Sequence, residues 1–226
     1  MVFGISDLHL SFSTDKPMSV FKGWDRYEER IEKNWRKLIG PNDTVVLPGD
    51  LSWAMKLEHT AADFAFIHQL PGKKIISKGN HDLWWSTVSK MTAFLEQQGF
   101  TSISILNNNA FPAESIAVCG TRGWMMNDET AGEKMLAREA GRLRASLEAG
   151  IQTGLEPVAF LHYPPVYDGV ACEPMMAVLK EYGVKRCYYG HVHRPGALRA
   201  CRGTFEGIRF APLSCDLIDF CPVLVE

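Results

Sequence analysis

Residues 74–82 read Lys-Ile-Ile-Ser-Lys-Gly-Asn-His-Asp, an apolar β-branched segment that runs directly into a polar cluster. Ile75 and Ile76 favour a buried strand, and Gly79 favours a sharp turn where that strand ends. Residues 44–50 show the same pattern, because Thr-Val-Val-Leu leads into Pro-Gly-Asp. Strands that end in polar loops are typical of α/β sheets, which bind ligands at the carboxyl ends of their parallel strands.

Strand-like and helix-like segments alternate along most of the chain. Apolar residues at helical spacing predict helices near residues 24–39, 57–70, 84–98, 130–149 and 174–182. Short apolar runs predict strands near residues 2–6, 44–47, 74–77, 102–106, 115–120, 157–161 and 186–189, with a strand-rich tail over 204–225. The pattern predicts one α/β domain over residues 1–226, with strands in layers and helices outside.

Composition and charge exclude several other classes of protein. The 226 residues are 46% hydrophobic and 22% charged, which fits a globular chain with its own core rather than a disordered or coiled-coil one. A net charge of −2 gives no general basic surface for nucleic acid. No apolar run is long enough for a membrane span, and the first residues lack the pattern of a signal peptide.

The six cysteines point to a reducing compartment. None forms a Cys-x-x-Cys pair, and Cys119 and Cys187 lie in apolar runs, where a thiol behaves as a small hydrophobic group. We therefore expect reduced core thiols rather than a disulfide framework. Together with the lack of a leader or membrane span, this predicts a soluble, cytoplasmic protein.

Five polar clusters follow the ends of predicted strands. They are Asp7-x-His9, Gly49-Asp50, Gly79-Asn80-His81-Asp82, the single His162 and Gly190-His191-x-His193. Five of the seven histidines fall in these clusters, a sorting that scattered surface histidines would not show. Because alternate residues of an extended segment share one side, Asp-x-His and His-x-His can each direct two side chains at one site. Asp7-x-His9 and His162 are weak signals when taken alone, whereas Gly-Asn-His-Asp and Gly-His-x-His are more specific. The ordered set of five carries the inference.

The ligand types in these clusters indicate transition metals. Two carboxylates, one amide oxygen and four imidazoles suit Mn, Fe or Zn rather than a thiolate cluster or an all-oxygen calcium or magnesium site. Seven protein ligands are too many for one such metal with open positions. They suit two metals about 3.5–4 Å apart that share a carboxylate. The glycines before Asp50, Asn80 and His191 would let the backbone approach the metals closely.

In these residues the chain resembles the calcineurin-like metallophosphoesterases. The pattern of that family is Asp-x-His, Gly-Asp, Gly-Asn-His-Asp/Glu, a lone His and Gly-His-x-His, and the clusters match it from the first strand to about residue 193. The resemblance implies a four-layer α/β/β/α fold, in which a central β-sandwich is flanked by helices. It also implies a hydrolase that acts on phosphate esters.

The resemblance divides the seven candidate ligands between two metals: Asp7, His9 and His193 would hold one, Asn80, His162 and His191 would hold the other, and Asp50 would bridge. His81 matches the catalytic histidine that faces the substrate without binding metal. Asp82 would support His81, or would only order the loop. A metal-bound hydroxide would attack phosphorus in line, and His81 would protonate the leaving oxygen or stabilise its charge.

Two further residues are candidates for substrate binding. Many family members have Gly-Asp-x-x-Asp, whose last carboxylate orients the catalytic histidine, but here the segment ends in Trp53. Trp53 could stack on a nucleobase or aryl group, or serve only in packing. Arg122 follows a predicted strand and could grip a phosphate with two hydrogen bonds, or be a structural arginine.

The sequence therefore predicts a dinuclear hydrolase of small or nucleotide-like phosphomonoesters or phosphodiesters. A nuclease is the alternative within the same chemistry; Arg194, Arg199 and Arg202 near the last cluster favour it, whereas the near-neutral charge favours a small substrate. A catalytically silent metal-binding scaffold on the same fold is the other alternative. It is less favoured because all seven candidate ligands and His81 are present.

Overall fold

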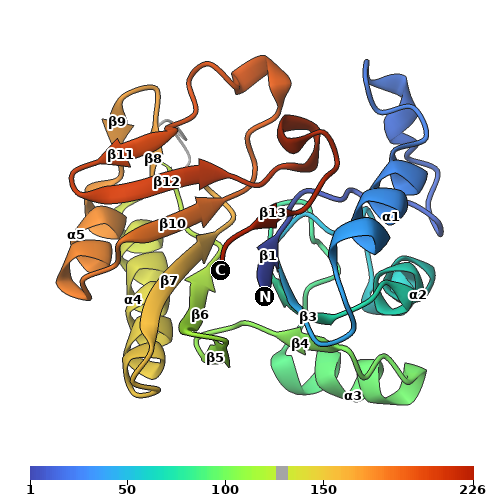
Figure 1. Ribbon diagram of the computed structural model, residues 1–226, viewed down its shortest axis with the longest axis horizontal. Coiled ribbons are helices and arrows are strands. Elements are labelled where there is room, and N and C mark those ends of the chain that lie inside the picture. Colours follow the sequence, from blue (N-terminus) through green and yellow to red (C-terminus); the bar gives the residue numbers. More distant parts are fainter. Residues whose placement is uncertain (126–131) are drawn as a thin grey trace.

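The computed structural model describes residues 1–125 and 132–226, and in these residues two sheets pack face to face with helices outside them (Figure 1). The first sheet has the order β13-β1-β2-β3-β4, with strands Val223–Leu224, Val2–Gly4, Thr44–Pro48, Lys73–Ser77 and Ile103–Ile105. The second has the order β11-β12-β10-β7-β6-β5, with strands Gly203–Phe205, Ile208–Pro212, Arg186–Tyr189, Glu156–Leu161, Ile116–Thr121 and Ala110–Ala113. A short hairpin joins β8 (Val166–Tyr167) to β9 (Val170–Ala171).

The helices cover the two outer faces of this sandwich, which confirms the predicted four-layer arrangement. Helices α1 (Tyr27–Leu38), α2 (Ala61–Gln69) and α3 (Val88–Gln98) lie beside the first sheet (Figure 1). Helices α4 (Glu133–Ile151) and α5 (Glu173–Glu181) lie beside the second sheet. No helix among the described residues combines the length and apolar character needed to cross a membrane.

Buried apolar side chains hold the layers together. Val46 and Ile75 of the first sheet pack with Val118 and Phe160 of the second, so the sheets share a core. Further clusters fill the space between each sheet and its helices. All six cysteines are free, as predicted, and four of them are buried.

Parallel pairing places the carboxyl ends of the strands of each sheet along one edge. Strands β1 to β4 pair in parallel, and so do β6, β7, β10 and β12. Beyond the strand ends, Ser6 and Ser214 form a parallel bridge, and the Ser6 amide donates to the Leu213 carbonyl at 2.8 Å. Because Ser6 follows β1 and Ser214 follows β12, the two carboxyl edges meet.

Some predicted boundaries were wrong. The helix expected from residue 84 begins at Val88, after a turn whose Thr87 hydroxyl accepts a hydrogen bond from the Lys90 amide at 3.4 Å. The helix expected over 57–70 starts as a 3-10 turn, Leu57–Thr60, before α2. The first two residues of the helix expected over 130–149 lie outside the described residues, and α4 extends to Ile151. The strands β5, β8 and β9 were not predicted.

Candidate metal centre

All five polar clusters lie where the two carboxyl edges meet, as expected from their positions after strands. Asp7 and His9 follow β1, Asp50 follows β2 and Asn80 follows β3. The second sheet contributes His162 after β7, and His191 and His193 after β10. The fold thus brings together seven side chains that are up to 186 positions apart in the sequence.

The backbone is left-handed at four of these residues. The φ angle is 59° at Asp7, 46° at His9, 53° at Asp50 and 68° at His191. Side chains other than glycine seldom adopt this conformation, and it concentrates at functional sites, where the surrounding structure holds it. Here it turns each chain sharply as it leaves its strand.

Two glycines allow the close approach that the sequence predicts. A Cβ atom at Gly79 would lie 2.1 Å from Oδ1 of Asp50 and 2.2 Å from its amide nitrogen. A Cβ atom at Gly190 would lie 2.5 Å from Oδ2 of Asp7. A larger residue at either position would displace a carboxylate of the centre.

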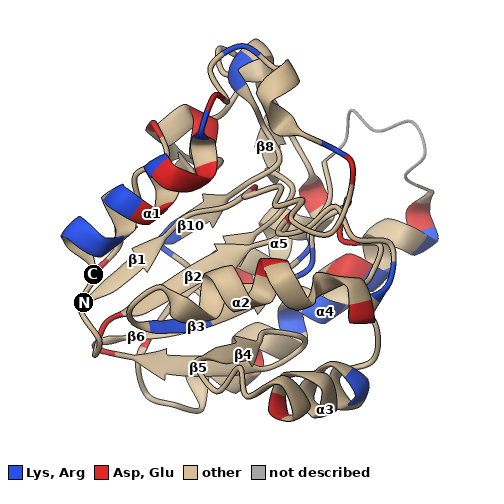
Figure 2. Ribbon diagram, turned by 90° about the vertical axis from the view of Figure 1, so that its right-hand side faces the viewer, with Lys and Arg blue, Asp and Glu red and all other residues tan. Residues whose placement is uncertain are grey.

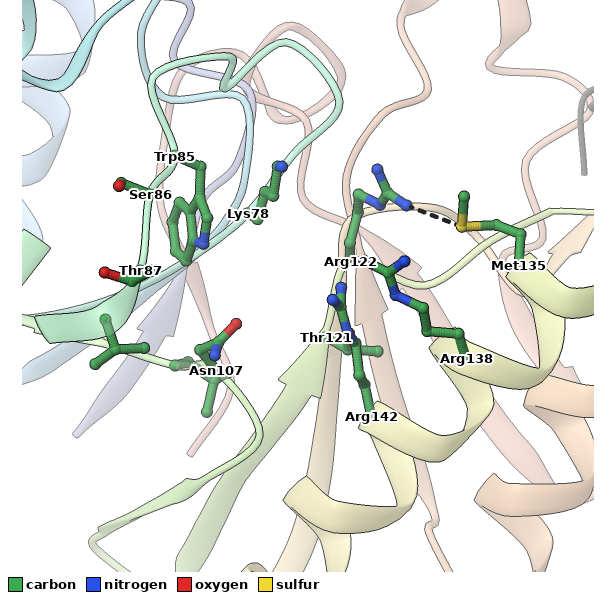
Figure 3. Close-up of a pocket in the computed structure, with 12 residues that line it drawn as sticks. Lys78, Trp85, Ser86, Thr87, Asn107, Thr121, Arg122, Met135, Arg138 and Arg142 are labelled. Atoms are coloured by element: carbon green, nitrogen blue, oxygen red, sulfur yellow. Dashed lines mark hydrogen bonds between the residues drawn. The ribbon is translucent and has the colours of Figure 1, made fainter. Parts of the chain in front are cut away.

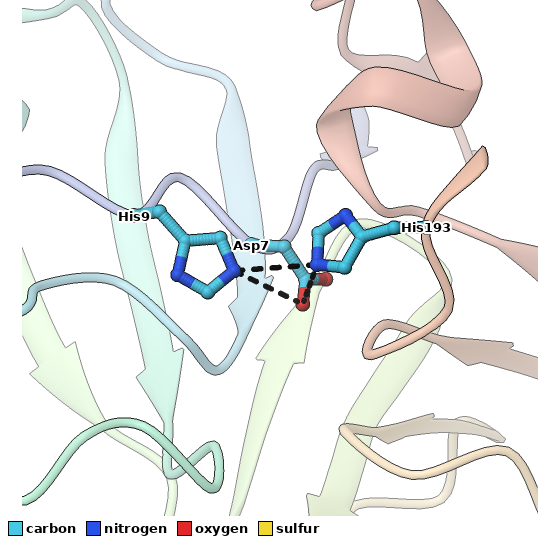
Figure 4. A group of neighbouring side chains, drawn as sticks. All are labelled: Asp7, His9 and His193. Atoms are coloured by element: carbon cyan, nitrogen blue, oxygen red, sulfur yellow. Dashed lines mark hydrogen bonds and ion pairs between the residues drawn. The ribbon is translucent and has the colours of Figure 1, made fainter. Parts of the chain in front are cut away.

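Asp7, His9 and His193 form the first group of potential ligands (Figure 4). The Nε2 atoms of the two histidines are 3.3 Å apart, and they lie 4.0 Å (His9) and 3.7 Å (His193) from Oδ1 of Asp7. Nδ1 of His193 donates to Oδ1 of Asp216 at 2.9 Å. That hydrogen bond leaves Nε2 of His193 as the ring nitrogen directed at its two neighbours.

Asp50, Asn80, His162 and His191 form the second group. Nδ1 of His162 donates to the Pro48 carbonyl at 3.1 Å, so in the neutral ring Nε2 carries a lone pair. That Nε2 lies 2.6 Å from Oδ1 of Asn80 and 3.5 Å from Oδ2 of Asp50. Nδ1 of His191 lies 2.9 Å from the same Asn80 oxygen. Acceptor atoms therefore converge on one point.

Asp50 connects the two groups. Its Oδ2 lies 3.5 Å from Nε2 of His162 and 3.9 Å from Nε2 of His9, one histidine from each group. Its other oxygen, Oδ1, accepts a hydrogen bond from the His81 amide at 2.8 Å, which fixes the carboxylate. A carboxylate with one oxygen between two sets of ligands is suited to bridging two metals.

Burial sets the charges of the centre. It lowers the pKa of His9 well below the usual value, with a further contribution from His193, and lowers the pKa of His162 to about 3. Both rings are therefore neutral at neutral pH, as metal ligands must be, and their contacts with Asp50 are not ion pairs. Burial, with the nearby charge of Asp7, raises the pKa of Asp50 well above the usual value. A buried carboxylate of this kind needs a cation beside it.

His193 differs from the other two imidazoles. Burial acts to lower its pKa, but the hydrogen bond with Asp216 and the charge of Asp7 outweigh burial and raise it. The negative charge that would hold a proton on Nε2 would equally hold a metal cation there. The residues present therefore fit a pair of divalent transition metals: neutral nitrogens, an amide oxygen and two carboxylates, with neighbouring groups that orient them.

His81 lies beside this centre with an exposed side chain. Its ring centroid is 5.6 Å from that of His9 and 4.5 Å from the ring of Trp53. Trp53 also stacks on His9, with centroids 4.9 Å apart, and the Lys16 ammonium lies 4.8 Å from the Trp53 ring. Trp53 therefore contacts the histidine that a carboxylate would orient in the Gly-Asp-x-x-Asp pattern.

Asp82 is fully buried and holds two loops together. Its oxygens accept hydrogen bonds from the backbone amides of Asp50 and Gly79, both at 2.8 Å, and of Leu51 at 2.9 Å. They also accept from the indole of Trp84 at 3.1 Å. Of the two roles considered for Asp82, these contacts support ordering of the loops, and its support of the His81 ring stays a prediction.

Arg122 lies apart from the seven potential ligands, in a neighbouring cavity (Figure 3). Its Nη2 atom is 3.7 Å from Sδ of Met135 and 3.5 Å from Oε1 of Glu139. Its guanidinium also lies 4.6 Å from the centroid of the Trp124 ring. The predicted binding of phosphate by Arg122 would therefore take place in that cavity.

Asp216 is a residue of the centre that the sequence analysis missed. It is 2% exposed, and besides orienting His193 it accepts a hydrogen bond from the Arg194 amide at 2.9 Å. A signal for it existed, because Ser214-Cys215-Asp216 follows the strand β12 as the other clusters follow theirs. The sequence pattern predicts only a strand-rich tail there.

Comparisons with known proteins agree with this geometry. A family model described as calcineurin-like phosphoesterase matches residues 2–195, a range that contains all five clusters. A protein of unknown function from Aquifex aeolicus, AQ665, has a similar structure, with a TM-score of 0.53, 20% identity, and coverage of 99% of this chain and 94% of that one. The phosphopantetheinyl hydrolase PptH from Mycobacterium tuberculosis also has a TM-score of 0.53, at 15% identity, with 100% and 96% covered.

No curated protein sequence matches the chain significantly. At these identities, the two structural likenesses show the fold. The family match covers most of the chain, and the geometry supplies clusters of potential metal ligands at the expected edge. The chain therefore belongs to the calcineurin-like phosphoesterase family and is a hydrolase of phosphate esters.

Proposed function

We propose that this protein hydrolyses small phosphate esters at a pair of metal ions held by Asp7, His9, Asp50, Asn80, His162, His191 and His193. The convergence of acceptor atoms in two adjacent groups carries the proposal: the groups share Asp7, and Oδ2 of Asp50 lies near His162 of one and His9 of the other. Without cations, the lone pairs and carboxylates there would repel one another at close range. Mn, Fe and Zn all suit this set of ligands.

Metal ions bound there would neutralise the phosphate oxygens and lower the pKa of water at the site. The protein would hold the ester in place through residues around the centre. His81, exposed and next to the centre, is positioned to meet the leaving oxygen.

Proton transfer by His81 follows from its surroundings. Although part of the ring is exposed, its packing against Trp53 and His9 desolvates it in part and lowers its pKa, so the ring is neutral at neutral pH in the free protein. The negative charge of a bound phosphate would raise that pKa again. His81 would then take up a proton as the substrate binds and give it to the leaving oxygen.

The space beside the centre suits a small alcohol group on the ester. A cavity of about 220 Å³ adjoins His191 and His193 and has an apolar wall that includes Met125, Tyr167 and Val192. Such a volume holds part of a small molecule. That a phosphopantetheinyl hydrolase shares this fold is consistent with hydrolysis of a small-molecule ester.

The surface charges favour this substrate class over a nucleic acid. In the view of Figure 2, basic and acidic residues are interspersed over the helices. Arg194, one of the arginines that had favoured a nuclease, binds Oδ1 of Asp219 at 2.7 Å and the Asp216 carbonyl at 3.0 Å. Binding to a nucleic-acid backbone needs a run of cations along an extended surface, whereas the charges over the helices in Figure 2 are mixed.

The test is hydrolysis of 4-nitrophenyl phosphate and bis(4-nitrophenyl) phosphate by protein stripped of metal and reloaded with Mn²⁺. We expect metal-dependent turnover of at least one ester, and the preferred ester identifies a monoesterase or a diesterase. Asn80→Ala should reduce turnover at least 100-fold. Asn42→Ala is the matched control, because Asn42 is exposed and precedes β2, at the opposite edge of the sheet.

Two results would contradict the proposal. One is turnover that does not depend on added metal or that survives in Asn80→Ala. The other is metal-loaded protein that hydrolyses neither of these esters nor any of the adenosine phosphates named below.

A further inference from the structure

A second cavity, of about 330 Å³, opens at the same edge of the sandwich and is not lined by any of the seven candidate ligands (Figure 3). Its walls come from both sheets and from two helices. Lys78 follows β3, Thr121 and Arg122 come from the end of β6 and the loop after it, and Arg138 and Arg142 project from α4. Figure 3 shows the arginines together on one side, opposite Lys78 and Trp85.

Positive charge exceeds negative charge among the side chains of this cavity. Lys78, Arg122, Arg138 and Arg142 line it, and no acidic residue is among its described lining. The carboxylate beneath it is the fully buried Glu139, whose Oε1 lies 3.0 Å from Arg142 and 3.5 Å from Arg122. Among the described residues, Glu139 thus contacts two of the four cations, and the positive charges around the cavity repel one another unless an anion joins them.

Glu139 is already saturated by its neighbours. Its second oxygen, Oε2, accepts a hydrogen bond from the Thr121 hydroxyl at 3.1 Å. Nε of Arg122 is buried and has no hydrogen-bond partner among the described residues. The cavity therefore retains donor groups that Glu139 does not use.

The opposite wall adds polar groups suited to an anion. Ser86, Thr87 and Val88 line it at the amino end of α3, where the helix dipole is positive. The indole of Trp85 supplies a flat apolar surface beside them. Guanidinium groups and a helix amino end are the features by which proteins commonly bind phosphate.

The cavity is a close neighbour of the candidate metal centre. Lys78 precedes Asn80 by two residues, a separation that an extended chain spans in about 7 Å at most. On the other side, the carbonyl of Arg122 accepts a hydrogen bond from the His162 amide at 3.0 Å. One small molecule could therefore reach both places.

We propose that this cavity is a second anion subsite, which binds a phosphate group of the substrate other than the one that is hydrolysed. The inference rests on the proposed function and narrows the substrate class to small molecules with two phosphate groups held apart by a spacer, as in a nucleoside bisphosphate. Arg138 is the best residue to test, because it is exposed on α4 and its replacement should spare the fold.

Binding can be measured without turnover by using alkane diphosphonates, whose carbon–phosphorus bonds a phosphoesterase does not hydrolyse. Calorimetry on the full chain loaded with Mn²⁺ would measure the affinities of two sets of ligands. One set is diphosphonates whose spacers have two to six carbons, and the other is alkylphosphonates of the same lengths. We expect one spacer length to bind at least tenfold more tightly than its monophosphonate. Arg138→Gln should remove most of that advantage.

Arg144→Gln is the matched control, since Arg144 lies on the same helix and pairs with Glu181 at 2.7 Å, outside the cavity. Arg144→Gln removes the same charge from α4, and the diphosphonate should still bind to it more tightly than the monophosphonate does. Equal affinity for both ligands at every spacer length would overturn the subsite. So would an advantage that Arg138→Gln and Arg144→Gln reduce equally, because the effect would then be general electrostatic attraction.

A hydrolysis experiment separates this inference from the proposed function. Wild-type protein should hydrolyse adenosine 3′,5′-bisphosphate with a higher kcat/KM than adenosine 5′-monophosphate or 3′-monophosphate. Arg138→Gln should lower the ratio of kcat/KM for the bisphosphate to kcat/KM for either monophosphate at least tenfold. Hydrolysis of simple esters without preference for the bisphosphate, together with equal phosphonate affinities, would refute the subsite alone. Tight diphosphonate binding without hydrolysis of any ester would refute the proposed function and leave the subsite standing.

Discussion

Replacing Asp82 with asparagine should loosen both loops that supply Asp50 and Asn80 to the candidate metal centre. Oδ2 of Asp82 accepts hydrogen bonds from the amides of Asp50 and Gly79, and Oδ1 accepts from Leu51, Ser52 and the Trp84 indole. Burial raises the pKa of Asp82 to about 6, so at pH 7.5 the group is mainly an ionised acceptor. Asparagine has nearly the same shape but carries an NH₂ group in place of one oxygen.

The magnitude follows from these contacts. Whichever way the amide turns, at least two N–H groups lose their acceptor and face another donor. A hydrogen bond to a charged group contributes about 1.5–3 kcal/mol, so the loss should be about 3–6 kcal/mol. That is a large share of the roughly 5–15 kcal/mol by which a domain is stable.

Urea unfolding at pH 7.5, followed by tryptophan fluorescence and circular dichroism, measures the effect on metal-free protein. Asp25→Asn is the control, because Asp25 is exposed and the same charge is removed. Equilibrium dialysis should also show weaker binding of Mn²⁺ by Asp82→Asn. If Asp82→Asn unfolds within 1 kcal/mol of the wild type and binds Mn²⁺ equally well, the reasoning about these loops is refuted.

Three other changes test separate parts of the account. Lys74 is 1% exposed, and burial lowers its pKa to about 8. Since the unfolded chain keeps this proton up to about pH 10.4, the free energy of unfolding should rise between pH 8 and 10.4, by up to about 3 kcal/mol relative to Lys74→Met. A difference between the two proteins that does not change with pH in urea titrations would contradict this. Gly79→Ala would place Cβ 2.1 Å from Oδ1 of Asp50, so bound Mn²⁺ per chain should fall below half of the wild-type value; unchanged metal content would show that the loops move apart freely. Trp53→Ala removes ring contacts with His81 and His9, which contribute about 0.5–1.5 kcal/mol, and should lower kcat/KM for a nitrophenyl ester about two- to twelvefold. Trp53→Phe should retain most of the activity. Equal activities of the wild type and Trp53→Ala would make Trp53 irrelevant to catalysis.

The layers and the place of the site could be predicted from the sequence because both depend on local patterns. Ile75 and Ile76, followed by Gly79 and Asn80, predict a strand and then a polar loop without any knowledge of the rest of the chain. Parallel pairing then brings such loops to one edge. For this reason the sequence points to seven candidate ligands although they are scattered from Asp7 to His193.

The packing around the ligands could not be predicted, because it depends on which loops meet in three dimensions. Asp82 accepts hydrogen bonds from backbone amides of a loop about 30 residues earlier in the chain. Asp216 accepts a hydrogen bond from His193, although it lies in a tail that the sequence predicts to be mostly strand. Arg122 was correctly placed after a strand, but its side chain lies in a cavity shared with α4, which the sequence does not reveal. Such contacts are set by tertiary structure and leave little trace in the spacing of residues.

The central claim is that seven side chains hold two metal ions, and anomalous diffraction from a crystal of Mn²⁺-loaded protein tests it most directly. The account predicts two anomalous peaks, one among Asp7, His9 and His193, the other among Asn80, His162 and His191, with Asp50 between them. A single peak, or peaks away from these residues, would contradict it.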